Sequence, residues 1–486
     1  MSQKHGLVCS LLLSIIFFVA YCSVSLQLYA AHQTRGDLTA YAQGMWNTVH
    51  GNFMASTYNY SVHNYYDKVV REITPENSNI MGIHLNPIIL IFLPAYVVFP
   101  FPSTLLILQA LLIAAGGWLI YLLAKGVLKN NVLAICIQFA YLIYFATVSA
   151  VLNQFHAYAL ALFFGPLLLL SSRGKKSWFY YLSLGLFLIV QENTSLVAAF
   201  FGVYLTLSPT TRKWGINTVL ISVTYFILAI YHAIPAFSPY DFYLFSGIYG
   251  SPLGGNIQQI ILGTLRNPLL FIESVFTPVN IVYMGNLLLA ITPFALLSPS
   301  MLLVGFSSLA QNILSSSLGL KTQQMHYESG SVAFLFYALI LGLSLFLSKT
   351  KYGQSKYGIM ACIAVLVLMT GISYKQFTSP RFNPHLLTIS LYTPRDKEMD
   401  SFINRIPATA SVSTQDYLSA QLSGRSNLYQ FPVYADRVEY LLLAKSDTVW
   451  PLSEEEQREW LRQIHANPQY LVDHETDNFI LFKQVQ

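Results

Sequence analysis

Long apolar runs separated by short polar loops dominate the first 373 residues of the chain. The first run covers residues 7–28, about twenty residues, which is long enough to cross a bilayer as a helix. Later apolar runs occupy residues 103–124, 131–150, 155–170, 178–190, 194–207, 214–234, 281–297, 301–316, 331–347 and 357–373. This pattern predicts an all-α polytopic protein with about 11 transmembrane helices.

Composition agrees with this prediction. Hydrophobic residues make up 54% of the chain and charged residues 10%, whereas a soluble domain has roughly a quarter of its residues charged. The sequence is therefore that of a multi-pass membrane protein, and the lipid bilayer is its first partner.

The basic residues predict the orientation. Lys4 precedes the first run, and later basic clusters stand at 125–129, 173–176, 212–213 and 349–356. A short run at 86–100 is interrupted by prolines; if it does not cross the membrane, every one of these clusters falls on the cytoplasmic side. We therefore expect 86–100 to be re-entrant or to lie on the surface, with the N-terminus cytoplasmic and the C-terminal part outside.

Residues from 374 onward have a different composition, richer in charge and proline. Short alternating stretches at 410–414, 438–443 and 478–482 predict strands. Ser453 followed by Glu456 forms the pattern of a capping box and predicts a helix. We expect a polytopic domain at 1–373, containing a large outer loop at 30–102, and a small extracytoplasmic α/β domain at 374–486.

Several functional classes lack sequence support. The chain contains no glycine-rich phosphate loop, dinucleotide fingerprint or metalloprotease motif, so we expect no nucleotide partner. The net charge of +5 comes from scattered clusters, which argues against a nucleic-acid partner. The four cysteines lie inside apolar runs without metal-ligand spacing.

The predicted topology brings several polar residues to the outer face. Asp37 follows the first run, Glu192 lies at a hairpin tip, and the others are His84, His156, Gln191, His326 and Tyr327. The runs on either side of Glu192 have about fifteen residues each, shorter than a full span, so its carboxylate should lie at membrane depth, where an ionisable group is costly and usually functional.

Purely structural explanations exist for the same residues. Asp37 is also suited to a helix N-cap or a solvated helix end. His84 and His156 are equally suited to cap helix ends, and residues 191–193 to a simple turn between helices. The convergence of all of them on one face favours a functional site.

A set of short motifs resembles a known family. They are Asp37-Leu, Gln43-Gly-Met-Trp46, His50-Gly, Gly82-Ile-His84 with Pro87, Leu108-Gln-Ala, Phe155-His156, Gln191-Glu192, His326-Tyr327, Val412-Ser-Thr-Gln415, Leu422-Ser-Gly-Arg425 and Phe431-Pro432. In order along nearly the whole chain, these resemble a family of predicted multi-pass membrane proteins of unknown function. That family in turn resembles the GT-C superfamily of integral-membrane glycosyltransferases, which take sugar from a polyprenyl-phosphate carrier.

The resemblance implies roles for individual residues. Asp37 matches the first-loop acid of such enzymes, which acts as general base or helps to hold a divalent cation such as Mg or Mn. Glu192 would be a second catalytic carboxylate, and His84 and His156 would contact the carrier phosphate or the acceptor. The chain departs from the better-known pattern in lacking a second acid next to Asp37, which weakens the case for a metal.

Further residues are expected to bind substrate. The basic ones are Arg35, Arg381 and Arg425, which would face the phosphate, although ordinary solvated or ion-paired arginines explain each of them too. Gln191, His326 and Tyr327 complete the set. The family also implies the plasma membrane of a prokaryote.

Two classes of function follow. The first is a hexosyltransferase that moves sugar from a polyprenyl-phosphate donor to an acceptor on the outer face. The second is a transporter or flippase for a lipid-linked or small polar substrate; common transporters contain inverted repeats, and none is evident here. A non-catalytic relative of the enzymes is a third alternative.

Overall fold

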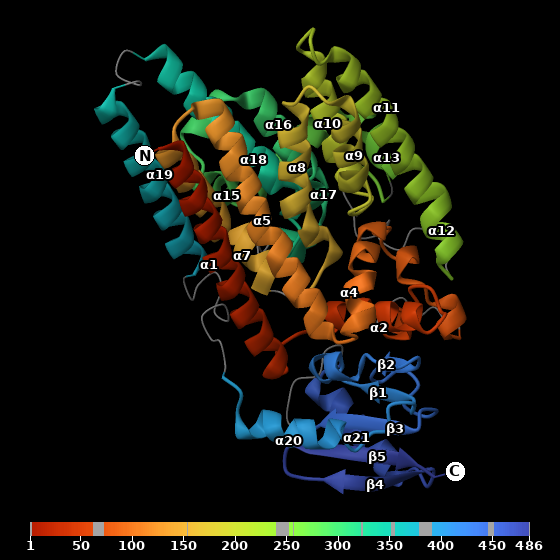
Figure 1. The fold of residues 1–486 in the computed structure, drawn as a ribbon. Coiled ribbons are helices and arrows are strands. Elements are labelled where there is room, and N and C mark those ends of the chain that lie inside the picture. The colour runs from red at the N-terminus through yellow and green to blue at the C-terminus, as the bar shows by residue number, and fades with distance from the viewer. Residues whose placement is uncertain are drawn as a thin grey trace.

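The computed structural model describes residues 2–61, 72–152, 154–239, 252–255, 257–321, 324–350, 355–378, 391–445 and 452–485 of the 486-residue chain. A helical bundle forms one end of the molecule and a small sheet domain the other (Figure 1). The first loop, with α2 (Gly36–Val49) and α4 (Leu93–Val98), lies between the two. The predicted combination of polytopic bundle and C-terminal α/β domain is confirmed.

Helices of very different length build the bundle. They are α1 (Gln3–Ala30), α5 (Pro102–Leu128), α6 (Asn131–Ile143), α7 (Phe145–Leu152), α8 (Ala161–Ser172), α9 (Ser177–Leu188), α10 (Thr194–Thr206), α11 (Arg212–Leu228), α12 (Ile234–Phe237), α13 (Ile257–Arg266), α14 (Pro268–Val275), α15 (Pro278–Leu289), α16 (Pro299–Ser307), α17 (Ala310–Leu314), α18 (Ser329–Lys349) and α19 (Lys356–Phe377). The helix α18 is apolar on every face and mostly buried, as a central helix should be. By contrast, α1, α11 and α19 turn most of their apolar surface outward, toward the expected lipid.

The described residues include five helices that are long and apolar enough to cross a membrane, or seven if each of two bent pairs is one span. Four more apolar helices have 10–17 residues. The run at 301–316 does not form one helix, because α16 ends at Ser307 and is followed by the separate α17. The run at 281–297 likewise ends its helix at Leu289. Most residues of α16 are buried in protein, whereas α15 buries only Asn280, Tyr283 and Leu287. A high hydropathy therefore does not distinguish a helix buried in protein from one that faces lipid.

Residues 87–98 form a 3-10 turn, Pro87–Phe92, followed directly by α4. This unit is shorter than the roughly twenty residues of a spanning helix. The Tyr96 hydroxyl donates a hydrogen bond of 3.0 Å to the carbonyl of Ala42, which ties α4 to α2. The segment therefore packs against α2.

The C-terminal domain contains one five-stranded sheet of order β2-β1-β3-β5-β4. Its elements are α20 (Pro394–Ile403), β1 (Val412–Thr414), β2 (Leu428–Gln430), β3 (Tyr440–Ala444), α21 (Glu454–Ala466), β4 (Tyr470–Glu475) and β5 (Phe479–Gln484). The pairs of β1 with β2 and with β3 are parallel, whereas β5 is antiparallel to β3 and β4. All five residues of the central strand β3 are buried, which explains its continuous apolar sequence.

The predicted capping box at the start of α21 is present. The Ser453 side chain accepts from the backbone of Glu456, and the Glu456 carboxylate accepts from the backbone of Ser453. The three strands expected from alternation correspond to β1, β3 and β5. Sequence reasoning missed α20, although Thr393 and Asp396 give it the same capping box.

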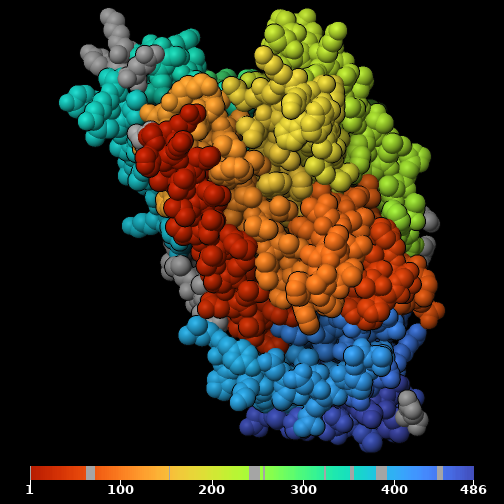
Figure 2. Space-filling model, in the orientation of Figure 1, coloured from red at the N-terminus to blue at the C-terminus, as the bar shows by residue number. Residues whose placement is uncertain are grey.

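The first loop completes both hydrophobic cores of the sheet domain. Tyr58 packs into the core on one side of the sheet, together with Phe402 of α20. Tyr60 and Ile83 pack into the core on the other side, which includes Ile464 of α21. Figure 2 shows the blue C-terminal residues in close contact with the red and orange residues of the first loop. The loop and the sheet domain thus form one packed unit.

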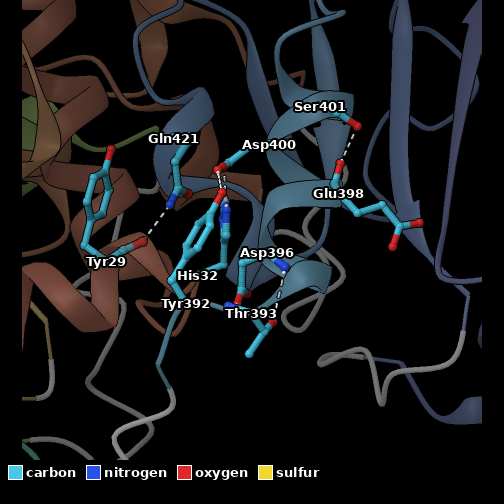
Figure 3. Close-up of polar contacts among 9 residues, drawn as sticks. All are labelled: Tyr29, His32, Tyr392, Thr393, Asp396, Glu398, Asp400, Ser401 and Gln421. Atoms are coloured by element: carbon cyan, nitrogen blue, oxygen red, sulfur yellow. Dashed lines mark hydrogen bonds and ion pairs between the residues drawn. The ribbon is translucent and has the colours of Figure 1, made fainter.

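A polar cluster joins the end of α1 to α20 (Figure 3). The buried His32 ring contacts the Asp400 carboxylate through Nε2 at 2.9 Å. The Tyr392 hydroxyl donates to the other Asp400 oxygen at 2.5 Å, and the Gln421 amide donates to the carbonyl of Tyr29 at 2.8 Å. These bonds hold the sheet domain against the first transmembrane helix.

Candidate functional site

Asp37 lies in the first turn of α2, directly after α1. Its side chain is partly accessible, and the backbone N–H groups at a helix N-terminus favour a negative charge there. Burial, and after it the Asp416 carboxylate, nevertheless raise the pKa of this carboxyl to about 6. A carboxyl with such a pKa is poised to accept a proton near neutral pH.

Gln154 holds Asp37 in place. Its Nε2 donates to Oδ2 of Asp37 at 3.0 Å, while its Oε1 accepts from the backbone N–H of Arg35 at 2.7 Å and of Leu38 at 3.4 Å. The Gln154 amide therefore caps α2 from another part of the chain, since Arg35 at the N-cap position makes no side-chain cap. Gln154 was not among the predicted site residues; its place at a polar tip between two apolar runs was the available signal.

Two stacked imidazoles lie beside Asp37. The rings of His156 and His326 have centroids 3.4 Å apart and planes 12° apart. Burial lowers the pKa of His156 well below its usual range and that of His326 to about 3, so both rings are neutral at physiological pH. Each neutral ring offers one N–H donor and one nitrogen that accepts.

The backbone sets the tautomer of His156. Its Nδ1 accepts the N–H of Tyr158 at 3.1 Å, as the N-cap of a short 3-10 turn, Ala157–Leu160. A nitrogen that accepts a hydrogen bond carries no proton, so the proton of the neutral ring is on Nε2. His156 therefore offers an N–H donor.

Glu192 reaches the site through His84. The Glu192 side chain is fully buried; one carboxylate oxygen contacts Nδ1 of His84 at 2.7 Å, and the other accepts from the backbone N–H of Leu85 at 3.0 Å. His84 is 19% exposed, and its ring lies 6.4 Å from that of His156 between centroids. The Gln191 amide is 3.4 Å from Nδ1 of His84. Glu192 thus orients an imidazole, as the carboxylate of a catalytic triad does.

Most predicted residues meet at this place. One ligand atom each from Asp37, His156 and His326 lies within 4.8 Å of the other two. The charge of His84 lowers the pKa of Asp37. Burial and, second, the Asp37 carboxylate raise the pKa of Tyr327 to about 12. Both rings are therefore close to the carboxylate. The three imidazoles and the Tyr327 phenol expected from the sequence therefore lie around the predicted acid, whereas Gln191 contacts His84.

One carboxylate oxygen and two imidazole nitrogens are the ligand atoms that this cluster offers to a metal ion. Mg prefers oxygen ligands in octahedral geometry, and two imidazoles with one carboxylate do not supply that. A metal-bound histidine normally donates from its second nitrogen, whereas Nδ1 of His156 accepts from the backbone and leaves Nε2 protonated. The residues present do not fit the expected Mg or Mn ion.

The arginines divide into three cases. Arg35 is exposed beside Asp37, and its charge lowers the pKa of Asp37 and of Asp416. Arg381 lies outside the described residues. Arg425 is buried within the sheet domain, where its guanidinium donates to the carbonyls of Leu422, Pro407 and Ala410 at 2.9, 3.2 and 2.9 Å. That arrangement gives Arg425 a structural role in place of the expected contact with phosphate.

The sheet domain supplies a second acid. Asp416 accepts from the Tyr58 hydroxyl at 2.9 Å, and a Cβ on Gly36 would lie 2.7 Å from its Oδ1. The carboxylate thus touches the residue preceding Asp37, and burial raises its pKa. Sequence reasoning saw no acid paired with Asp37, because the partner is nearly four hundred residues away in the chain.

A third buried carboxyl, Glu328, follows His326 and Tyr327. The Tyr283 hydroxyl donates to its Oε1 at 2.9 Å, while Oε2 has no hydrogen-bond partner among the described residues. Burial raises the pKa of Glu328 to about 7. The carboxyl therefore holds its proton more readily than an ordinary glutamate.

Comparisons with known proteins agree with this architecture. A family model described as a predicted membrane protein (DUF2079) matches residues 27–481. No curated protein matches the sequence. The crystal structure of ArnT from Cupriavidus metallidurans bound to undecaprenyl phosphate is similar, with a TM-score of 0.52 over 97% of this chain and 98% of that chain at 10% sequence identity. The likeness shows that the two chains share a fold, the GT-C fold of ArnT.

Proposed function

The chain belongs to the family of predicted membrane proteins whose model it matches over residues 27–481, and we propose that it transfers a sugar from a polyprenyl-phosphate carrier to an acceptor hydroxyl. The reaction takes place where the bundle meets the sheet domain, on the outer face of a prokaryotic plasma membrane. The convergence of Asp37 with the imidazoles of His84, His156 and His326 at that junction carries the proposal. The shared fold with a protein that binds undecaprenyl phosphate supports the choice of carrier.

Asp37 is the general base in this proposal. Gln154 occupies Oδ2, which leaves Oδ1 for the proton of the acceptor hydroxyl. The acceptor oxygen forms the new bond to the anomeric carbon while the bond from that carbon to the phosphate oxygen breaks. The carrier phosphate leaves with the bonding electron pair.

The imidazoles stabilise the departing phosphate by donating hydrogen bonds. His156 presents Nε2–H, and its neutrality means that it contributes a dipole and not a charge. Arg35, exposed at the rim, supplies a positive charge within reach of the same region. Glu192 is a positioning residue, because its carboxylate contacts His84 and lies out of reach of substrate.

The test is transfer of labelled sugar from a panel of polyprenyl-phosphate donors by the purified protein in lipid, comparing wild type with Asp37→Asn. We expect a loss of at least about a hundredfold in turnover for a missing general base, with donor binding retained. Uptake of substrate into vesicles that survives Asp37→Asn, without transfer from any donor, would instead favour the transporter.

The thermal stability of Asp37→Asn serves as a control for misfolding. Because burial raises the pKa of Asp37 to about 6, the folded protein binds this proton more tightly than the unfolded chain. Above that pH the charged carboxylate destabilises the fold, and an asparagine removes the penalty. We expect Asp37→Asn to unfold at the same or a higher temperature than wild type at about pH 8. Lost activity with raised stability would exclude misfolding as the cause.

A further inference from the structure

A cavity of about 680 Å³ opens between the turn that joins α8 to α9 and the turn that joins α10 to α11. The tip that joins α9 to α10 carries Glu192 beside His84, so the α8–α9 and α10–α11 turns lie at the opposite ends of these helices, on the side of the molecule away from the blue sheet domain (Figures 1 and 2). The cavity is therefore remote from Asp37 and its imidazoles. Its volume is in the range of small-ligand pockets.

One wall of the cavity carries two positively charged side chains. Arg173 and Lys175 line the cavity from the α8–α9 turn, and Nη1 of Arg173 donates to the Tyr337 hydroxyl at 3.1 Å. No described carboxylate forms an ion pair with either residue. The nearest acid in the surrounding sequence is Glu192, which is buried at the other site. The two cations are thus available to an anion.

The facing wall consists of hydroxyl groups. Ser208, Thr210 and Thr211 come from the α10–α11 turn, and the hydroxyls of Ser208 and Thr210 lie 2.9 Å apart. The Thr211 hydroxyl donates to the carbonyl of Leu205 at 2.7 Å, and one of Ser208 and Thr210 donates to the other, which leaves one hydroxyl hydrogen for a phosphate oxygen. The guanidinium of Arg173 and the ammonium of Lys175 donate to phosphate oxygens with the help of their charge. The two walls together match the chemistry of a phosphate group.

The floor is aromatic and apolar. The rings of Phe201 and Tyr204 are stacked at 6.2 Å, and Trp214 is stacked on Tyr180 at 4.8 Å. Leu207, also on the lining, is 68% exposed toward the outside of the bundle. A free phosphate ion would leave this apolar surface uncovered, whereas the glycerol and upper acyl region of a lipid would cover it.

We propose that this cavity binds the phosphate headgroup of an anionic phospholipid. The excess of basic residues at this end of the chain, taken alone, has a topological explanation. The topological explanation accounts for the basic residues but not for the cavity, its hydroxyl groups or its stacked aromatic rings. A bound lipid of this kind would anchor the two helix hairpins, α8–α9 and α10–α11, to the leaflet opposite the sugar-transfer site.

The experiment is native mass spectrometry of the full-length protein released from neutral detergent, with phosphatidylglycerol, phosphatidylcholine or inorganic phosphate added. We expect a phosphatidylglycerol adduct that outlasts the phosphatidylcholine adduct as collision energy rises. Arg173→Gln with Lys175→Gln should lower its occupancy roughly tenfold or more, since each charged hydrogen bond contributes on that scale. Ser208→Trp, which fills the cavity and leaves the charge unchanged, should lower it similarly.

The matched control is Lys125→Gln with Lys129→Gln. Both lysines are basic residues of the same predicted membrane face, at the end of α5, and do not line the cavity. An equal loss in this control would overturn the proposal, because general attraction by the basic face would then explain binding. A phosphatidylcholine adduct that survives collision energy as well as the phosphatidylglycerol adduct would overturn the proposal too. An inorganic phosphate adduct that survives collision energy as well as the phosphatidylglycerol adduct would overturn the lipid assignment in favour of a free phosphate ion.

Discussion

The Gln154 amide and the Asp37 carboxylate are joined by a hydrogen bond of 3.0 Å, and the same amide accepts the backbone N–H of Arg35 at 2.7 Å. One side chain from the α7–α8 connection thus both caps α2 and orients the acid at its start. The position of the proposed base is set by a glutamine that belongs to a different element.

Gln154→Ala should lower turnover by roughly ten- to a hundredfold, because the carboxylate loses its orientation. Donation from Nε2 favours the charged carboxylate, so its removal should also move the pKa of Asp37 above about 6. The measurement is a pH–rate profile, which a purely structural role would not shift. Gln138→Ala is the matched control, since Gln138 is a buried glutamine that binds Ser10 and Ser14 of α1 away from the site. An unshifted profile in Gln154→Ala would contradict the assigned role.

The wild-type rate should rise with pH through a midpoint near the pKa of Asp37, about 6. The general base works only when deprotonated, so well below this pH each unit of pH should change kcat/KM by about tenfold. His156 and His326 remain neutral across this range and should add no second limb. A rate that falls as pH rises through 6 would argue against a carboxylate base.

His84 and Glu192 should behave as one unit in a double-mutant cycle. Glu192→Gln replaces one of two acceptors with an amide NH2, and the N–H groups of His84 and Leu85 cannot both be satisfied. We expect a large loss of turnover from Glu192→Gln, a similar loss from His84→Ala, and little further loss in the double variant. Additive losses would show that the two side chains act separately.

Gly36 is needed for the close approach of the sheet domain to α2. A Cβ at this position would lie 2.7 Å from Asp416 Oδ1 and 2.9 Å from Cε1 of Tyr58. Gly36→Ala should therefore destabilise the protein by about 1–3 kcal/mol and reduce transfer. Gly285→Ala is the control, because its Cβ meets no atom within 4 Å and alanine favours a helix. Thermal unfolding of both variants measures the difference. Unchanged stability in Gly36→Ala would mean that Asp416 and Tyr58 move aside at little cost in free energy.

Activity should persist in the presence of a strong chelator. The tautomer of His156 and the nitrogen-rich set around Asp37 are unsuited to Mg or Mn. Transfer assays with and without chelator, followed by metal add-back, give the result directly. Loss of transfer that Mn restores would show that the histidines rearrange to bind an ion.

Short-range patterns were sufficient for much of the architecture. Apolar runs predicted the membrane-spanning character, and the capping pattern at Ser453 and Glu456 predicted α21. These features depend on a few neighbouring residues, and propensity, capping and hydropathy act over that distance. The polar residues at the loop tips, such as Asp37 and Glu192, were likewise visible because charge in an apolar chain is conspicuous.

Contacts between distant segments required the folded chain. Gln154 contacts Asp37, and Asp416 contacts the start of α2, because the helix ends and the sheet domain pack together there. Arg425 turned inward for the same reason, since backbone carbonyls of its own domain surround it. Hydropathy also cannot distinguish an apolar helix in lipid from one inside protein, so α16 and α17 became short buried pieces of an expected span. Local chemistry thus determined which groups are available, and packing over long separations decided which of them meet.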